Sequence, residues 1–177
     1  MGGVAVIHYG YERSTTDVDI LYAHADGKIL ERLKEYFKLV LKAKNGWHHL
    51  EHRKTGVRLE LVPEGGLTTY GFIPGPKLVG GKDSVISLHG LVWLKMVSGR
   101  MQDLGDLERL AMVRMSEMRS IGAKLPLELQ ERYDQLLVQT AKRMENDPSV
   151  HGGAEEIHES AGTYRRTLRK KRRKAKA

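Results

Sequence analysis

Two aspartates separated by one residue are the first pattern in this chain that suggests chemistry. Asp17 and Asp19 belong to the run Asp-Val-Asp-Ile-Leu-Tyr, whose alternation of polar and apolar residues is typical of a strand. Because successive side chains of a strand point to opposite faces, both carboxylates lie on one face and repel each other. Such hard oxygen ligands suit magnesium or manganese bound together with substrate phosphates. On its own, the same pattern also describes an ordinary exposed strand face.

A third acid and a pair of glycines extend this pattern. Glu60 lies between two leucines in the strand-like run 57–62, where it is either a solvated surface acid or a third carboxylate facing the two aspartates. Gly2 and Gly3 precede an apolar helical segment, and exposed amides at a helix start can hold a phosphate. The residues alone therefore indicate a metal and nucleotide site built from a glycine turn and three acids.

Alternating helices and strands are expected to position these residues. In the first half of the chain, periodicity and turn residues predict a helix over 2–11, a loop over 12–16, a strand over 17–22, a helix from 29 to 41, and strands over 47–53 and 57–62. The last two strands form a hairpin through Lys54-Thr55-Gly56. A loop is expected over 63–83, which holds three of the five prolines and six glycines. Helices are predicted over 87–99, 103–119 and 127–145.

This order of elements predicts an α+β (α/β) fold with a small mixed sheet, a C-terminal helical segment and a disordered basic tail. We expect a core over 1–83, a helical region completing the domain over 84–147, and the tail over 148–177. A length of 177 residues suits one compact domain of this kind. Trp47 and Trp93 are most simply core residues.

The charge of the chain is concentrated in the tail. Nine of the 30 Lys and Arg residues lie between 165 and 177, where there is no acid, so the rest of the chain carries a net charge of −1. Such a block attracts polyanions such as RNA, although it also serves as a solubilising tail. The chain has no cysteine, and no apolar run approaches the roughly 18 residues that span a bilayer. We therefore expect a cytoplasmic protein that binds no membrane.

These residues together resemble the signature of the DNA polymerase beta-like nucleotidyltransferase superfamily. In that superfamily a Gly-Gly or Gly-Ser turn is followed by an acid-apolar-acid strand and then by a third acid in a neighbouring strand. Members of the similar small bacterial branch, which includes abortive-infection toxins, often read His-Gly and then Arg-x-Thr-x-Asp-Ile-Asp. Arg13, Thr15, Asp17 and Asp19 match that pattern here.

The resemblance continues downstream and covers residues 2 to 112. A leucine-rich helix carries Lys95, and Arg100, Asp103 and Asp106 match an Arg-x-x-Asp-x-x-Asp motif of the same branch. Lys95 shares a helical stripe with leucines, so it either seeks an anion or reaches solvent along the apolar surface. Asp103 is either a functional acid or a helix N-cap, with Asp106 then in the first turn.

The resemblance implies transfer of a nucleoside monophosphate from a nucleoside triphosphate (NTP) to an acceptor hydroxyl. Asp17 and Asp19 would hold Mg²⁺ or Mn²⁺, and Glu60 would bind the metal on the acceptor side or accept the proton. Asp103 is a second candidate base. The implied nucleotide-binding residues are Gly2, Gly3, Arg13, Thr15, Lys95 and Arg100. RNA is the favoured acceptor, through the basic tail Arg165 to Lys176, and toxins of this branch work beside a cognate antitoxin.

Two features depart from the superfamily. The chain begins at the glycine turn, whereas members normally have a helix and a strand before it, so either the true start lies upstream or the sheet exposes an edge. Glu60 stands where many members have aspartate. The alternative function is therefore a non-catalytic protein that binds nucleic acid or a partner on a degenerate nucleotidyltransferase fold. A separate metal hypothesis, zinc at His48 and His52, lacks a third ligand at suitable spacing.

Overall fold

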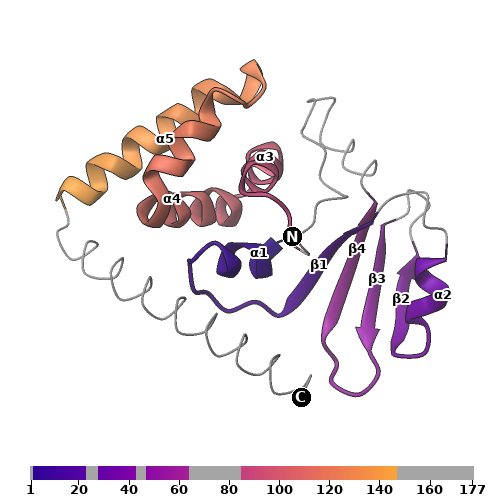
Figure 1. Ribbon diagram of the computed structural model, residues 1–177. Coiled ribbons are helices and arrows are strands. Elements are labelled where there is room, and N and C mark those ends of the chain that lie inside the picture. The colour runs from indigo at the N-terminus through magenta and orange to yellow at the C-terminus, as the bar shows by residue number, and fades with distance from the viewer. Residues whose placement is uncertain (1, 23–27, 43–46, 64–84, 147–177) are drawn as a thin grey trace, which may run out of the picture.

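The protein has a mixed α+β architecture in which a twisted sheet lies beside a group of helices (Figure 1). The structure is a computed structural model that describes residues 2–22, 28–42, 47–63 and 85–146. Along these residues the elements are α1 (Gly2–His8), β1 (Asp17–Tyr22), α2 (Ile29–Leu33), β2 (Phe37–Lys42), β3 (His48–His52), β4 (Arg58–Pro63), α3 (Leu88–Ser98), α4 (Met101–Gly122) and α5 (Leu127–Asn146). The expected α+β class is confirmed at this level.

The four strands of the described part form one sheet in the order β1-β4-β3-β2. β1 runs parallel to β4, whereas β3 is antiparallel to both β4 and β2, so the sheet is mixed as predicted. The predicted hairpin between β3 and β4 is confirmed. Gly56 closes its turn with φ +69°, and its amide donates to the carbonyl of His52 at 2.9 Å.

The helix expected from 29 to 41 is wrong beyond its first turns. α2 ends at Leu33, and Phe37–Lys42 is the edge strand β2 paired with β3. The pairing has an irregularity between Leu39 and Leu41, which inserts one extra residue into β2. This insertion breaks the strict alternation of the strand and gives its apolar residues the spacing of a helix. The segment nevertheless forms a strand, because its pairing with β3 outweighs the local pattern.

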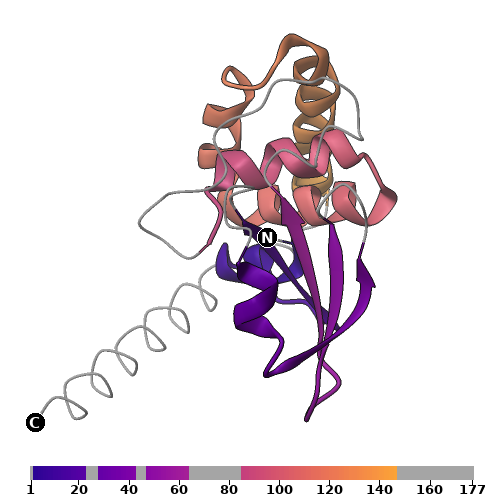
Figure 2. The same ribbon diagram turned by 90° about the vertical axis from the view of Figure 1, so that its right-hand side faces the viewer.

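The sheet has a different hydrophobic cluster on each face. Leu50, Leu59 and Leu61 form a small cluster that packs against residues of α2. The other face joins the main core, which contains Val62 of β4, residues of α1, and the buried sides of α3, α4 and α5. In the two views, α1 lies between the sheet and these helices (Figures 1 and 2). The helix-facing side of β1 and β4 therefore lies toward α1 and the helices beyond it.

The three predicted helices of the second half are confirmed, with shifted ends. Ser87 caps α3 by accepting a hydrogen bond from the amide of Gly90 at 3.1 Å, and Gly99 ends it with φ +61°. α4 begins two residues earlier than expected and α5 packs across it, where the buried Tyr133 hydroxyl donates to the carbonyl of Met118 at 3.0 Å. Trp93 is a core residue of α3, as predicted.

Several predictions lie outside the described residues. They are the loop over 63–83 beyond its first residue, and the basic tail over 148–177. Within the described part of the chain, no helix combines the length and the apolar character that crossing a bilayer requires.

Candidate active site

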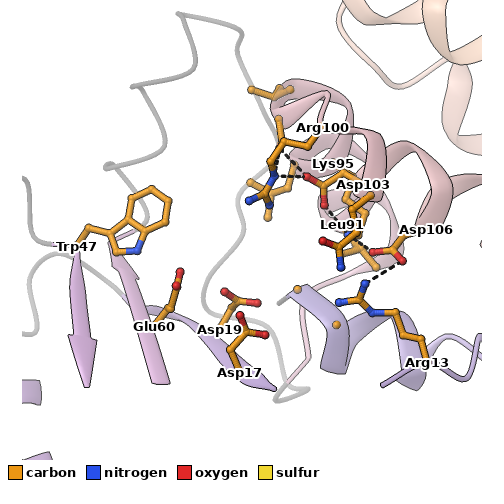
Figure 3. A pocket seen from close by; sticks show the side chains of 16 residues that line it. Arg13, Asp17, Asp19, Trp47, Glu60, Leu91, Lys95, Arg100, Asp103 and Asp106 are labelled. Carbon is orange, nitrogen blue, oxygen red and sulfur yellow. Dashed lines mark hydrogen bonds and ion pairs between the residues drawn. The ribbon is translucent and has the colours of Figure 1, made fainter. Parts of the chain in front are cut away.

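One pocket between the sheet and the helices gathers nearly all the predicted site residues (Figure 3). The predicted residues that line it are Gly2, Gly3, Arg13, Asp17, Asp19, Glu60, Lys95, Arg100 and Asp103. Thr15 is the exception, because its hydroxyl instead donates to Oδ1 of Asp17 at 3.0 Å and thereby orients that carboxylate. Residues that are 89 positions apart in the sequence thus share one cavity, since Asp17 and Asp106 both line it.

The acidic wall comes from the paired strands β1 and β4. Their parallel register places Asp19 opposite Glu60, so the two carboxylates stand on neighbouring strands of the same face. Glu60 also lies beside His49 of β3, whose Nδ1 is 3.3 Å from its Oε1. The structure therefore brings Asp17, Asp19 and Glu60 to one wall, and Glu60 is not a fully solvated surface acid, because its side chain is 26% exposed.

Burial and like charges act on the same carboxyl group in this wall. Burial raises the pKa of Asp19, and the carboxylates of Asp17 and Glu60 raise it further. A folded-state pKa above the unfolded value means that the ionised Asp19 costs stability at neutral pH. Positive charges, Lys95 among them, act against this rise without cancelling it, and the three carboxylates of the wall form an environment that favours a cation.

The donors of this wall fit a hard divalent cation in their chemistry, because all three are carboxylates. Among the described residues, however, no three His, Cys, Asp or Glu side chains are already gathered closely enough to hold a metal ion. The acids therefore supply candidate ligands for Mg²⁺ or Mn²⁺ without forming a finished coordination shell. His48 is buried, and Nδ1 of His52 lies 2.8 Å from the Thr55 hydroxyl, so these imidazoles do not extend the acidic wall.

The two glycines allow α1 to approach the acidic wall closely. Gly2 has φ +55°, and a β-carbon at this position would overlap Oδ2 of Asp19. A β-carbon on Gly3 would lie 2.6 Å from the Thr15 hydroxyl and 2.7 Å from Nη2 of Arg13. These positions favour glycine for a physical reason, because an added side chain would displace the pocket side chains of Asp19, Thr15 and Arg13.

Gly2→Ala is expected to lower any activity of this pocket strongly and to reduce thermal stability, because the new methyl group must displace the Asp19 carboxylate. Gly56→Ala is a matched control: its φ is +69°, but no atom lies within 4 Å of the added β-carbon. Both variants carry the strain of a left-handed backbone. A difference between them in melting temperature or in activity therefore reports the overlap with Asp19. Equal activity in the two variants would show that the close approach is unimportant.

The opposite wall is a buried network of charges between α3 and α4. Lys95 is only 5% exposed, and its ammonium group donates to Oδ1 of Asp103 at 2.8 Å and to Oδ2 of Asp106 at 2.7 Å. Arg13 donates to Oδ1 of Asp106 at 3.3 Å and connects the loop after α1 to the same network. Lys95 therefore seeks anions as predicted, and the alternative in which it reaches solvent is wrong.

Asp103 is the most heavily bonded acid of the pocket. Besides Lys95, it accepts hydrogen bonds from the Ser98 hydroxyl at 2.6 Å and from Nε of Arg100 at 2.7 Å. It lies in the first turn of α4, whose N-cap position is Arg100, so the N-cap interpretation of Asp103 is wrong. Burial alone would raise the pKa of Asp103, but the hydrogen bonds from Lys95, Ser98 and Arg100 outweigh burial and lower it. A carboxylate with these partners is a weak proton acceptor, which argues against the predicted role as a second base.

The lowered pKa of Asp103 predicts a dependence of stability on pH. In the unfolded chain the Asp103 carboxylate binds a proton near its ordinary pKa of 3.8. In the folded protein its pKa is lower, so it binds a proton only at lower pH. Its contribution is therefore fully present above pH 4 and is lost as the pH falls below about 4. We expect urea unfolding midpoints to fall over this range more steeply in the wild type than in Asp103→Asn. Parallel profiles for the two proteins would contradict the bonding described for Asp103.

Residues that the sequence did not assign to the site complete the pocket. Asp106 matches the motif without a predicted site role, and Trp47, which the sequence predicts to be a core residue, is half-buried and lines the cavity. The remaining lining residues are Leu91, Leu94, Val97, Ser98 and Gln102. The spacing of Leu91 and Lys95 on one helical stripe was the available signal for the α3 residues. For Trp47 no sequence signal distinguished a pocket wall from a core position.

Comparisons of the chain with protein-family models, with curated proteins and with solved structures give no match.

Proposed function

We propose that the protein is a metal-dependent nucleotidyltransferase that moves a nucleoside monophosphate from an NTP to an acceptor hydroxyl. The observation that carries this proposal is the pairing of two unlike walls. Across one cavity, three carboxylates on β1 and β4 face a network of three cations and two aspartates on α3, α4 and the loop after α1. A triphosphate with its divalent cations is a ligand that needs both kinds of wall.

The reaction requires an in-line displacement at the α-phosphorus of the NTP. The acceptor oxygen forms a bond to this phosphorus, the bond to the oxygen bridging the β-phosphate breaks, and pyrophosphate leaves with the electron pair. The acceptor proton passes to a base, for which Glu60 is the candidate because it lies in the acidic wall away from the cations. Mg²⁺ or Mn²⁺ held by Asp17 and Asp19, with Glu60 as a further ligand where it does not act as the base, would neutralise charge on the attacking and leaving oxygens.

The basic residues have different roles in this proposal. The Arg100 side chain is 72% exposed and lines the pocket, so we assign its guanidinium group to a phosphate of the NTP. Lys95 is buried, and its charge is offset by two carboxylates, so we assign it the task of holding Asp103 and Asp106 in place. Gly2 and Gly3 offer backbone without side chains beside the acids.

RNA is the proposed acceptor, and the basic segment from Arg165 to Lys176 is its proposed second contact. We expect deletion of residues 165–177 to weaken RNA binding and to flatten its dependence on salt, because fewer counterions are released per complex. NTP binding should remain unchanged. Affinities measured at several salt concentrations for the full and shortened chains test this, and identical salt slopes would exclude the tail from acceptor binding. A cognate antitoxin remains a proposed partner.

The proposed reaction is tested by incubating the protein with magnesium, total cellular RNA and each α-labelled NTP in turn. Label is expected in RNA, for one or a few of the four nucleotides, and only while the divalent ion is present. Label in the protein itself would identify a protein acceptor instead of RNA. No label in either fraction, from a protein shown to be folded, would favour the non-catalytic binding protein over the transferase.

A further inference from the structure

Among the described residues that line the charged pocket, Trp47 is the one aromatic residue. It directly precedes β3 and lies beside Glu60, with its ring directed toward the cavity (Figure 3). The side chain is half-buried, because part of it packs against the main hydrophobic core. Leu94 and Val97 of α3 add apolar surface to the same cavity. The pocket therefore offers a flat apolar surface in addition to its two charged walls.

Trp47 and the cations lie on opposite sides of the acidic residues. In Figure 3 Arg13, Lys95 and Arg100 are on one side of Asp17 and Asp19, and Trp47 and Glu60 are on the other. In-line displacement places the leaving pyrophosphate and the attacking hydroxyl on opposite sides of the phosphorus. Because pyrophosphate belongs with the cations, the hydroxyl must arrive from the side of Trp47. This step rests on the proposed transferase function.

From this arrangement we infer that Trp47 stacks on the base of the nucleotide that carries the attacking hydroxyl. An indole ring offers a wide π face, and base stacking on such a face tolerates any base. The acceptor subsite thus takes the unpaired terminal nucleotide of a nucleic acid strand. A serine hydroxyl or an aliphatic alcohol has no planar group to fill this surface. Trp47 is accordingly a specificity-determining residue of the acceptor side.

The test uses two short single-stranded RNA oligomers that differ only at the 3′ nucleotide. One ends in an ordinary nucleotide, and the other ends in an abasic ribose that keeps the same hydroxyl. For the wild type we expect the abasic oligomer to have a KM about tenfold higher, because it lacks the stacked base. Trp47→Leu keeps apolar volume against the core but has no flat face, so it should not distinguish the two oligomers. Trp47→Phe should restore part of the difference.

Two readouts separate this inference from the transferase proposal. The KM for the NTP should be unchanged in Trp47→Leu, since the base of the donor does not contact Trp47 in this arrangement. In the Trp93→Phe protein, whose only remaining tryptophan is Trp47, the base-ended oligomer should quench fluorescence more than the abasic one. Transfer by Trp47→Leu with the same oligomer preference as the wild type would overturn the stacking inference and leave the transferase intact. If Trp47→Leu raises only the KM for the NTP, Trp47 contacts the donor nucleotide and the stacking inference is overturned. If no protein, the wild type included, shows transfer, both proposals are overturned.

Discussion

Asp19→Asn is expected to lower the rate of nucleotidyl transfer by about 10²–10³-fold while the protein remains folded. The substitution removes one of the negative charges that attract the metal, and an amide oxygen is a weaker ligand than a carboxylate. Because burial and two neighbouring carboxylates raise the pKa of Asp19, its ionised form destabilises the folded state at neutral pH. We therefore expect the variant to unfold at an equal or higher temperature than the wild type. Asp17→Asn should lower activity to a similar degree.

This prediction is checked by transfer rates at saturating NTP together with thermal unfolding curves. Asp134→Asn is the matched control, since it makes the same chemical change on the exposed side of α5, away from the pocket. The control should keep full activity. Full activity of Asp19→Asn would exclude the acidic wall as the metal-binding part of the active site. Strong destabilisation of this variant would show instead that Asp19 stabilises the fold.

Lys95→Met is expected to produce the largest loss of stability, about 3–5 kcal/mol of the free energy of unfolding. The methionine fits the space of the lysine stem but leaves Asp103 and Asp106 buried without their shared cation. Activity should also fall, because α3 and α4 then hold Arg100 and Arg13 less firmly. Urea unfolding at neutral pH measures the loss. Arg143→Met, which removes an exposed ion pair with Glu108 on α4, should change stability very little.

A combined variant distinguishes lost charge pairing from lost packing at Lys95. Lys95→Met with Asp103→Asn and Asp106→Asn also removes the two buried carboxylate charges that Lys95 offset, and it should regain part of the lost stability. Recovery without activity is the expected pattern, since the network that positions the arginines is still missing. If the triple variant is no more stable than Lys95→Met, the loss comes from packing and the buried network has no special role.

Local patterns were sufficient for the two strands of the acidic wall but not for their pairing. Alternation around Asp17 and Glu60 predicted both strands, whereas the parallel register of β1 and β4 joins distant segments and decides that Glu60 faces the aspartates. The sequence failed at β2, where the irregularity at Val40 imitates helical spacing and only pairing with β3 reveals the strand.

The partners of Lys95 lie on the next helix, so their contact depends on how α3 and α4 pack, which no local pattern specifies. Trp47 needed the same tertiary information, because an aromatic residue before a strand suits a core and a pocket wall equally well.

The most direct measurement compares nucleotide incorporation with pyrophosphate release in the wild type and in Asp17→Asn. With magnesium, an RNA acceptor and the preferred NTP, we expect the wild type to release one pyrophosphate for each nucleotide attached to RNA, as the balance of the reaction requires. Asp17→Asn, folded to the same extent, should do neither. Pyrophosphate release that persists in Asp17→Asn, or a folded wild type that binds RNA and NTP without joining them, would contradict a transferase built on this pocket.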